Sequence, residues 1–268
     1  LGFTSPAVSS TNQLYNIVAN PSGVFKYIKE GRMVWPLTWI VVAGTLPGVF
    51  IGAFIRINLL SDPTIFKIFA GFVLLYIGLR LIKDIFKKNN NKNNSEQRFQ
   101  ELVKIFKSNQ NGGSLQLPRS SVKKFNFKEL KYEFYGEIFT VPTISMFIIS
   151  FIVGIAGGAY GIGGGAIIAP IYIAFYKLPV YTVAGPALMG TFITSVAGVC
   201  FYQLLSPFYP TLTIAPDWLL GVLFGIGGLI GMYIGASIQK YIPAKIIKWI
   251  LGICIFFLAI YYILEIFK

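Results

Sequence analysis

A run of glycines inside a long apolar segment is the feature of this sequence that could bind a ligand. Residues 154–170 read GIAGGAYGIGGGAIIAP and lie within the apolar segment 143–177. Clustered glycines interrupt a helix, and the next helix begins with amides that have no partner inside it. Such amides, at the positive end of a helix dipole, hold anions without a formal charge. We therefore expect an anion site at Tyr160, Gly161, Gly163, Gly164 and Gly165.

The segment that carries these glycines is too long for one membrane crossing and too short for two. As a straight helix, residues 143–177 would extend roughly 52 Å, against about 30 Å of hydrocarbon core. We predict two half-helices, 143–157 and 165–176, joined by unwound backbone. Backbone of this kind is tolerated at membrane depth only where it is buried in protein or lines a wet cavity. Helix packing is the alternative role for the glycines, and it suits Gly154 and Gly158 better than the run 163–165.

The composition indicates the class of protein that surrounds this segment. Of the 268 residues, 55% are hydrophobic and 12% charged, and the mean hydropathy is +0.67, whereas a soluble domain carries about 25% charged residues. These values predict an all-α polytopic membrane protein. The chain has no histidine, which excludes histidine metal sites and the usual catalytic triads. We expect no metal, no cofactor and no catalytic residues.

Seven apolar segments of spanning length divide the chain, at 6–28, 36–56, 63–86, 143–177, 186–205, 217–239 and 243–267. A proline stands at or beside the start of each, where a helix tolerates its missing N–H. These prolines are Pro6, Pro36, Pro63, Pro142, Pro186, Pro216 and Pro243.

The two ends of the chain resemble each other at a spacing of 180–183 residues. Pro6 and Thr11 match Pro186 and Thr191, and the ladder Gly44/Gly48/Gly52 matches Gly227/Gly231/Gly235. We predict two homologous transmembrane repeats, 1–86 and 142–268, flanking an insert at 87–141. The first repeat lacks a counterpart of 143–177, so we expect about thirty-five further residues with a glycine-rich element before Leu1. Each glycine ladder predicts close helix packing.

Two polar stripes lie on otherwise apolar helices. The first comprises Ser9, Asn12, Asn16 and Asn20, with Thr11 and Gln13 beside them, and the second comprises Thr191, Thr194 and Ser195. Lipid disfavours such faces, so they should point inward. Hydrogen bonds between helices and the lining of a transport pathway are two roles that the pattern supports equally.

The charge distribution predicts topology rather than nucleic-acid binding. The net charge is +13, but Lys and Arg gather in 87–137 and at the ends of apolar segments, as the positive-inside rule describes. Residues 26–32 and the insert should be cytoplasmic, and Arg56 should snorkel from a helix end. If 143–177 re-enters rather than crosses, Lys177 and Lys240 also fall inside and loop 206–216 falls outside. This arrangement obeys the charge rule better and favours inverted repeats.

The insert should hold a short helix and a β-hairpin. Phe99, Leu102 and Phe106 share one helical face, and 130–134 and 138–141 read as paired strands. A solvated loop is the simplest interpretation, and contact with anionic lipid heads is the alternative.

Residues 161–170, GIGGGAIIAP, followed by Pro179, Ala187 and Gly190-Thr191, make the chain resemble the sulfite exporter TauE/SafE family. Residues 6–11, PAVSST, form the degenerate first-half copy of this region and support the resemblance. It implies export of small sulfur-containing anions, such as sulfite or organosulfonates, across the plasma membrane. Members of the family have a glycine-rich motif in each half, and the first half of this chain has none.

Three classes of function stay open: an exporter of small anions, a channel-like anion uniporter of other specificity, and a membrane-embedded scaffold or sensor that does not transport. An enzyme is disfavoured because the segments contain no histidine and no deep carboxylate. The same absence disfavours proton coupling. A negative cell interior would drive anion exit by about 2.3 kcal/mol per charge per 100 mV.

Overall fold

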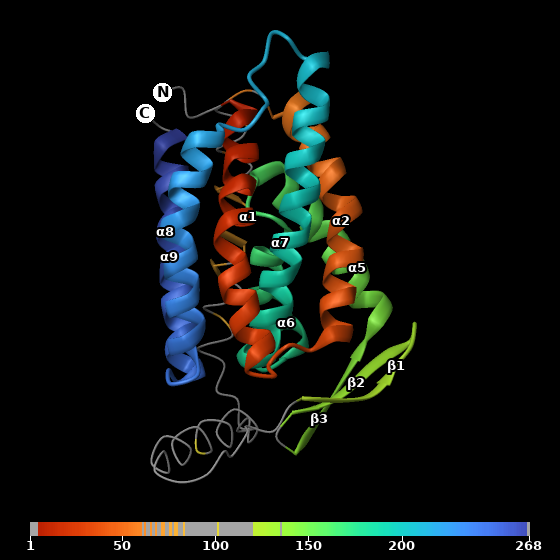
Figure 1. Ribbon diagram of the computed structural model, residues 1–268. Coiled ribbons are helices and arrows are strands. Elements are labelled where there is room, and N and C mark those ends of the chain that lie inside the picture. Colours follow the sequence, from red (N-terminus) through yellow and green to blue (C-terminus); the bar gives the residue numbers. More distant parts are fainter. Residues whose placement is uncertain are drawn as a thin grey trace.

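The fold is a helical bundle with a small sheet at one end (Figure 1). The computed structural model describes residues 5–60, 120–134 and 136–266, together with isolated positions between 62 and 101. Its helices are α1 (Pro6–Lys29), α2 (Trp35–Asn58), α5 (Thr143–Tyr160), α6 (Gly164–Tyr176), α7 (Val180–Leu205), α8 (Trp218–Gln239) and α9 (Ala244–Ile266). A 3-10 turn, Ser206–Phe208, follows α7. Most of segment 63–86, and the helix predicted around Phe99 and Phe106, lie outside the described residues.

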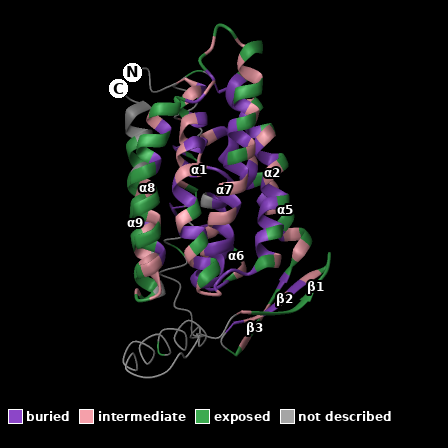
Figure 2. Cartoon of the chain, viewed as in Figure 1, coloured by how far each residue is buried: buried purple, intermediate pink, exposed green. Residues whose placement is uncertain are grey.

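Four of the described helical segments are long and apolar enough to cross a membrane: Trp35–Asn58, Thr143–Tyr160, Val180–Phe208 and Trp218–Gln239. The length and apolar composition of these helices confirm the prediction of a helical membrane protein. Burial differs among the helices, since α8 and the described part of α9 are mostly exposed, whereas α2, α5, α6 and α7 contribute residues to the buried core (Figure 2).

Most of the helix starts follow their prolines, and one does not. Pro6 and Pro36 lie in the first turns of α1 and α2. The prediction that Pro186 opens a helix is wrong, because α7 begins at Val180, directly after Pro179. The additional turn before Pro186 carries Val180, Tyr181 and Val183, which are buried in the core. Their burial offsets the hydrogen bond that an internal proline removes.

α1 lies between α7 and α8. Leu14 and Val18 of α1 face Gly221 and Gly225 of α8, so these two helices run parallel. Against α7 the order is reversed, since Gln13 faces Gly198 and Tyr27 faces Gly185. α2 runs parallel to α7, because Val41 lies against Gly190 and Ile57 packs beside Tyr202.

The helices α5 and α6 form an antiparallel hairpin. Ser145 and Tyr176 share a hydrogen bond of 2.7 Å near its open end, and Ser150 and Tyr172 share one of 2.6 Å one turn further in. The chain therefore enters and leaves the hairpin at the end of the bundle that carries the sheet (Figure 1).

The two glycine ladders differ in their surroundings. A Cβ at Gly44 would lie 2.5 Å from Cβ of Ser150, and Cβ atoms at Gly48 and Gly52 would overlap carbonyl oxygens of α5. The packing predicted for this ladder is confirmed. For Gly227, Gly231 and Gly235 of α8 the prediction is not met by the described residues, because a Cβ at any of them meets no described atom within 4 Å.

The predicted β-hairpin forms, and a third strand joins it. β1 (Ser121–Phe125), β2 (Glu129–Phe134) and β3 (Glu137–Pro142) pair antiparallel in the order β1-β2-β3. The interpretation of this part as a solvated loop is wrong for β2, since Leu130, Tyr132 and Phe134 are buried in the main core. The alternation of polar and apolar residues buries one face of the strand against the helices.

Tyr132 attaches the sheet to α7. Its hydroxyl shares a hydrogen bond of 3.0 Å with Oγ1 of Thr182. Burial raises the pKa of Tyr132 well above its ordinary value, the hydrogen bond from Thr182 opposing it, so the phenol stays protonated.

Tyr132→Phe should lower the free energy of unfolding by about 1 kcal/mol, the net worth of one buried neutral hydrogen bond. The ring stays in place, and Thr182 keeps its bond to the carbonyl oxygen of Pro179. Thermal unfolding in detergent measures the change. Wild-type stability of the variant would mean that this bond does not hold the sheet.

Candidate functional site

The backbone breaks where the glycine motif predicted. Gly161 ends α5 in the left-handed region, with φ of 82°, and Gly163 precedes α6 with φ of 80°. Both positions favour glycine because a Cβ is strained there. The amides of Gly161 and Gly163 donate to the carbonyl oxygen of Gly157, at 2.9 Å and 3.3 Å. The break is therefore a fixed reversal of the chain at residues 161–163, and α5 continues three residues further than the predicted end at 157.

The polar face of α1 binds the carbonyl groups around the break. Ser9 Oγ donates to the carbonyl oxygen of Ala159 at 3.2 Å. Asn12 Nδ2 donates to Gly161 at 3.1 Å, and Asn16 Nδ2 to Ile162 at 3.0 Å. Of the two roles left open for this stripe, interhelical hydrogen bonding applies to all three side chains. The carbonyl groups around the break are therefore satisfied by side chains of α1.

Arg56 lies beside this contact. We expected it to snorkel from the end of α2, but its side chain is fully buried. Its Nε donates to Ser9 Oγ at 3.2 Å, so Ser9 joins the guanidinium to the backbone of α5. The error arose because the position of Arg56 near the end of an apolar segment does not reveal that α1 and α7 cover that end.

α7 packs directly on the start of α6. A Cβ at Gly165 would overlap the carbonyl oxygen of Ala187 and lie 2.6 Å from the hydroxyl of Thr191. A Cβ at Gly163 would lie 3.1 Å from Ser195 Oγ. A Cβ at Gly164 would lie 2.5 Å from Cβ of Thr45 in α2. Glycines are therefore required here by close approach as well as by conformation.

The predicted residues of the α7 stripe divide by their hydrogen bonds. Thr191 and Thr194 donate to the carbonyl oxygens of Ala187 and Gly190, one turn back in their own helix. Ser195 is buried, and its hydroxyl has no partner among the described residues.

Two predicted residues lie at the edge of this arrangement or away from it. Tyr160 is half-buried at the end of α5. Thr11 is directed elsewhere, since its hydroxyl accepts a hydrogen bond of 2.9 Å from the amide of Asp217, the N-cap of α8. Its match to Thr191 in the sequence therefore does not bring it to the break.

A cavity of about 360 Å³ opens on the α7 side of the break. Gly165, Thr191 and Asn16 stand at one end of its wall, and Tyr27 and Gln239 at the other. The remaining lining residues are small or apolar except for one asparagine: Asn20, Ala169, Ala184, Ala187, Leu188, Gly231, Met232, Gly235 and Ala236. None of these residues carries a carboxylate.

Asn20 belongs to the polar stripe of α1 but was not among the residues predicted to bind a ligand. It is fully buried and lines the cavity, and neither atom of its amide has a hydrogen-bond partner among the described residues. A buried amide without partners costs about 1–3 kcal/mol, so a ligand or ordered water in the cavity is its natural partner. The signal was present, because Asn20 follows Asn16 by one helical turn on the same face.

The start of α6 supplies donors of the same kind. No side chain caps this helix at Gly163, and the first-turn amides of a helix have no partner within it. Gly165, in that first turn, lines the cavity. The site therefore combines helix amides and an asparagine amide with an apolar wall, a set suited to a small anion or polar solute rather than a cation. Within the described residues, no group of His, Cys, Asp and Glu could hold a metal ion.

Comparison with known proteins gives the arrangement a context. The sequence profile described as Sulfite exporter TauE/SafE matches residues 1–262. The chain is 21% identical over 262 residues to the Probable membrane transporter protein YunE of Bacillus subtilis (strain 168), covering 98% of this chain and 82% of the relative. It is 29% identical over 139 residues to a probable membrane transporter protein of Methanocaldococcus jannaschii, covering 50% of this chain and 47% of the relative.

A third relative, the Probable membrane transporter protein YdhB of Bacillus subtilis (strain 168), is 24% identical over 120 residues, 45% of this chain and 46% of the relative. No solved structure matches the chain. The profile match spans both polar stripes, the glycine break and α8, and with it the chain belongs to the sulfite exporter TauE/SafE family of membrane transport proteins.

Proposed function

We propose that this transporter exports small sulfur-containing anions, such as sulfite or organosulfonates, across the plasma membrane. The observation that carries the proposal is the uncapped start of α6, which meets the cavity at Gly165 beside Asn16 and Asn20. Amide N–H groups complement oxyanions, and the helix dipole adds a positive potential at that end.

The lining of the cavity favours an anion over a cation. Its described side chains include no carboxylate, and the carbonyls of Ala159, Gly161 and Ile162 are turned to α1. An anion that leaves the cell gains about 2.3 kcal/mol per charge per 100 mV from a negative interior. Channel-like uniport driven by this membrane potential would therefore be sufficient for export.

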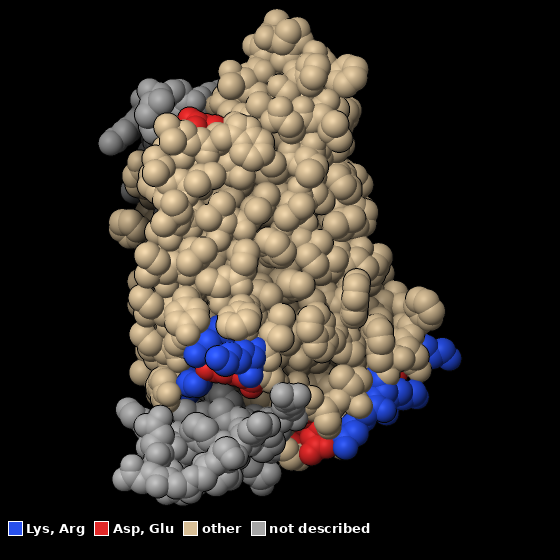
Figure 3. Space-filling view, viewed as in Figure 1, with Lys and Arg blue, Asp and Glu red and all other residues tan. Residues whose placement is uncertain are grey.

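We place the end of the bundle that carries the sheet in the cytoplasm. Lys26, Lys240 and the lysines of β1 lie at that end, where basic residues gather on the face seen in Figure 3. Loop 206–216 contains no Lys or Arg. In this orientation α5 and α6 form a re-entrant hairpin, which enters from the cytoplasmic side and returns to it, and the insert 87–141 is cytoplasmic.

The helix directions support two inverted repeats. α1 and α7 match at a spacing of 180 residues yet run antiparallel, and α2 and α8 also run in opposite directions. We infer that 1–86 and 142–268 are related by a pseudo-two-fold axis in the membrane plane. The ladder Gly227/Gly231/Gly235 of α8 then corresponds to the ladder Gly44/Gly48/Gly52 of α2, although no described residue packs on it.

Flux through the reconstituted protein tests the function. Proteoliposomes should take up or release sulfite and sulfoacetate under an applied membrane potential, and sulfate serves to compare specificity. Flux of other anions alone would favour a uniporter of different specificity. No anion flux at either polarity would contradict transport and favour the scaffold or sensor.

A further inference from the structure

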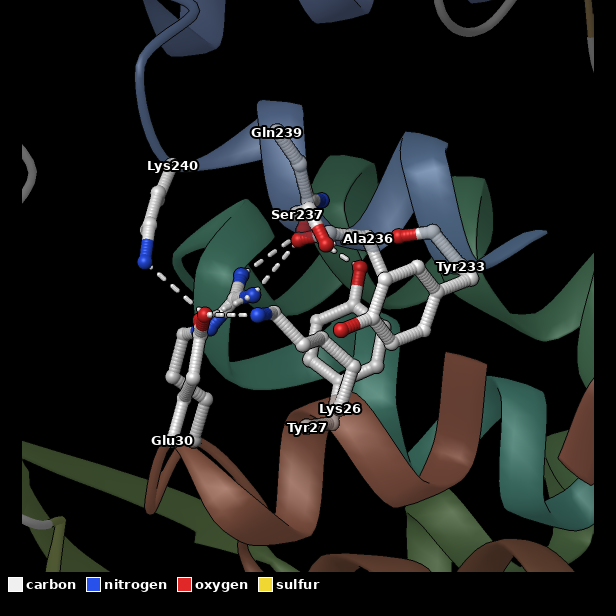
Figure 4. A network of polar contacts seen from close by, with 9 residues as sticks. Lys26, Tyr27, Glu30, Tyr233, Ala236, Ser237, Gln239 and Lys240 are labelled. Atoms are coloured by element: carbon white, nitrogen blue, oxygen red, sulfur yellow. Dashed lines mark hydrogen bonds and ion pairs between the residues drawn. The ribbon is translucent and has the colours of Figure 1, made fainter. Parts of the chain in front are cut away.

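A cluster of charged residues stands where α1 and α8 end together (Figure 4). Glu30 forms ion pairs with Lys26 at 3.3 Å, Arg32 at 2.7 Å and Lys240 at 2.8 Å. Three cations thus converge on one carboxylate. Lys26 also lies over the ring of Tyr233, 5.3 Å from its centroid.

The surplus positive charge of this cluster is shielded from water. The exposed fraction of the Arg32 side chain is 3%, and that of Glu30 is 11%. Partly buried charge of one sign is unfavourable unless an opposite charge compensates it. The cluster therefore has the electrostatic capacity for a second anion beside or instead of the Glu30 carboxylate.

The same cluster closes one end of the cavity. Arg32 donates from Nη1 to the side-chain oxygen of Gln239 at 3.0 Å and from Nη2 to the carbonyl oxygen of Ala236 at 2.7 Å. The hydroxyl of Tyr27 donates to the same oxygen of Gln239, and the Arg32 guanidinium stacks on the Tyr27 ring at 4.4 Å. Tyr27, Ala236 and Gln239 all line the cavity. Movement of Arg32 would therefore open the cavity wall at this end.

We propose that Lys26, Arg32 and Lys240 form an anion-recognition vestibule at the cytoplasmic mouth of the cavity, in which Glu30 is a resident carboxylate that the transported sulfite or sulfonate displaces. The Tyr27–Gln239 contact is the gate that Arg32 holds shut. The inference rests on the proposed function, because it names the entry site for the same cavity. The ligand is a small oxyanion, and anionic lipid headgroups carry the same chemistry.

Protonation does not operate this gate. Burial alone would raise the pKa of Glu30, but the hydrogen bond from Lys240 and the charges of Arg32 and Lys26 together hold that pKa below its ordinary value. The groups that face Glu30 are these three cations and Tyr27. Glu30 therefore stays ionised, and the affinity for sulfoacetate, whose own charge does not change in this range, should be constant between about pH 6 and 8. A strong loss of affinity across that interval, removed by Glu30→Gln, would contradict a resident carboxylate.

Thermal stabilisation of the detergent-solubilised protein by sulfoacetate at low ionic strength tests the vestibule without requiring transport. Removing the competing carboxylate in Glu30→Gln should lower the half-saturating concentration about threefold to tenfold. Lys240→Gln should raise it by a similar factor. The matched control is Glu129→Gln, which removes a carboxylate paired with Lys124 and Lys131 of the sheet and should leave the concentration unchanged.

Three outcomes would overturn the proposal. In the first, Glu30→Gln lowers the melting temperature without changing the half-saturating concentration, which identifies the cluster as a clamp between α1 and α8. In the second, Glu30→Gln and Lys240→Gln alter stabilisation by a short-chain phosphatidylglycerol but not by sulfoacetate, which identifies a lipid site. In the third, Lys240→Gln has no effect on sulfoacetate. Flux of the wild-type protein, measured separately, reports on the proposed function itself.

Discussion

Replacing Gly165 by alanine should abolish transport and lower the yield of folded protein. The added Cβ would overlap the carbonyl oxygen of Ala187 and lie 2.6 Å from the amide nitrogen of Thr191. Both are backbone atoms of α7, so no rotamer change relieves the contact, and α6 must separate from α7. Overpacking of this kind costs about 1–3 kcal/mol, and more where backbone must move. The separation also displaces the start of α6 from the cavity.

Proteoliposome flux and thermal unfolding measure this effect, and Gly78→Ala is its matched control. Gly78 is also a buried helical glycine, but a Cβ there would meet no atom of the described residues closer than 3.4 Å. The control should retain flux and stability. If Gly165→Ala transported at the wild-type rate, the close packing of α6 on α7 would not be needed for function.

Replacing Asn20 by leucine should raise stability and lower flux. The buried Asn20 amide has no hydrogen-bond partner among the described residues, so an apolar side chain of similar size removes a cost of about 1–3 kcal/mol. If the amide donates to the anion, its loss removes a hydrogen bond to a charged group, about 1.5–3 kcal/mol. That range corresponds to a fall in flux at low substrate concentration of roughly 10- to 100-fold.

Gln13→Met separates this effect from a general response to apolar substitution. Gln13 is also buried on α1 with no partner for its amide among the described residues, but it faces Gly198 and is not part of the cavity wall. The Gln13→Met variant should gain stability and keep the wild-type flux. Equal flux in Asn20→Leu and the wild-type protein would exclude Asn20 from the pathway, whatever the change in melting temperature.

Local signals in the sequence were sufficient for much of this structure. Glycine needs no tertiary contact to interrupt a helix, so the break at 161–163 and the two half-helices could be predicted. Apolar length and proline position are also local signals, and they located most helix ends. The stripe of Ser9, Asn12 and Asn16 could be assigned to the interior, although not to the particular carbonyls that it binds.

The features that the sequence did not reveal depend on which elements meet. Arg56 is buried because α1 and α7 cover the end of α2, and β2 is buried because the sheet folds back on the helices. Thr11 matches Thr191 by position, yet it serves the start of α8. The α8 ladder has the same spacing as the α2 ladder, but spacing alone does not state whether a helix lies against it.

The central claim is that an anion passes the start of α6 through the cavity, and thiol modification at Thr191 tests it most directly. Thr191→Cys, in a chain whose exposed Cys200 and Cys254 are replaced by serine, places a thiol on the cavity wall beside Gly165. Thr194→Cys is the control, since Thr194 is buried outside the cavity wall.

We expect an anionic sulfonatoethyl methanethiosulfonate to modify Thr191→Cys faster than the cationic trimethylammonium reagent does. The modification should block flux, and sulfoacetate should slow it, while Thr194→Cys should not react. A thiol at position 191 that neither reagent reaches from either side of the membrane, or one that the cation modifies faster, would contradict an anion pathway at the start of α6.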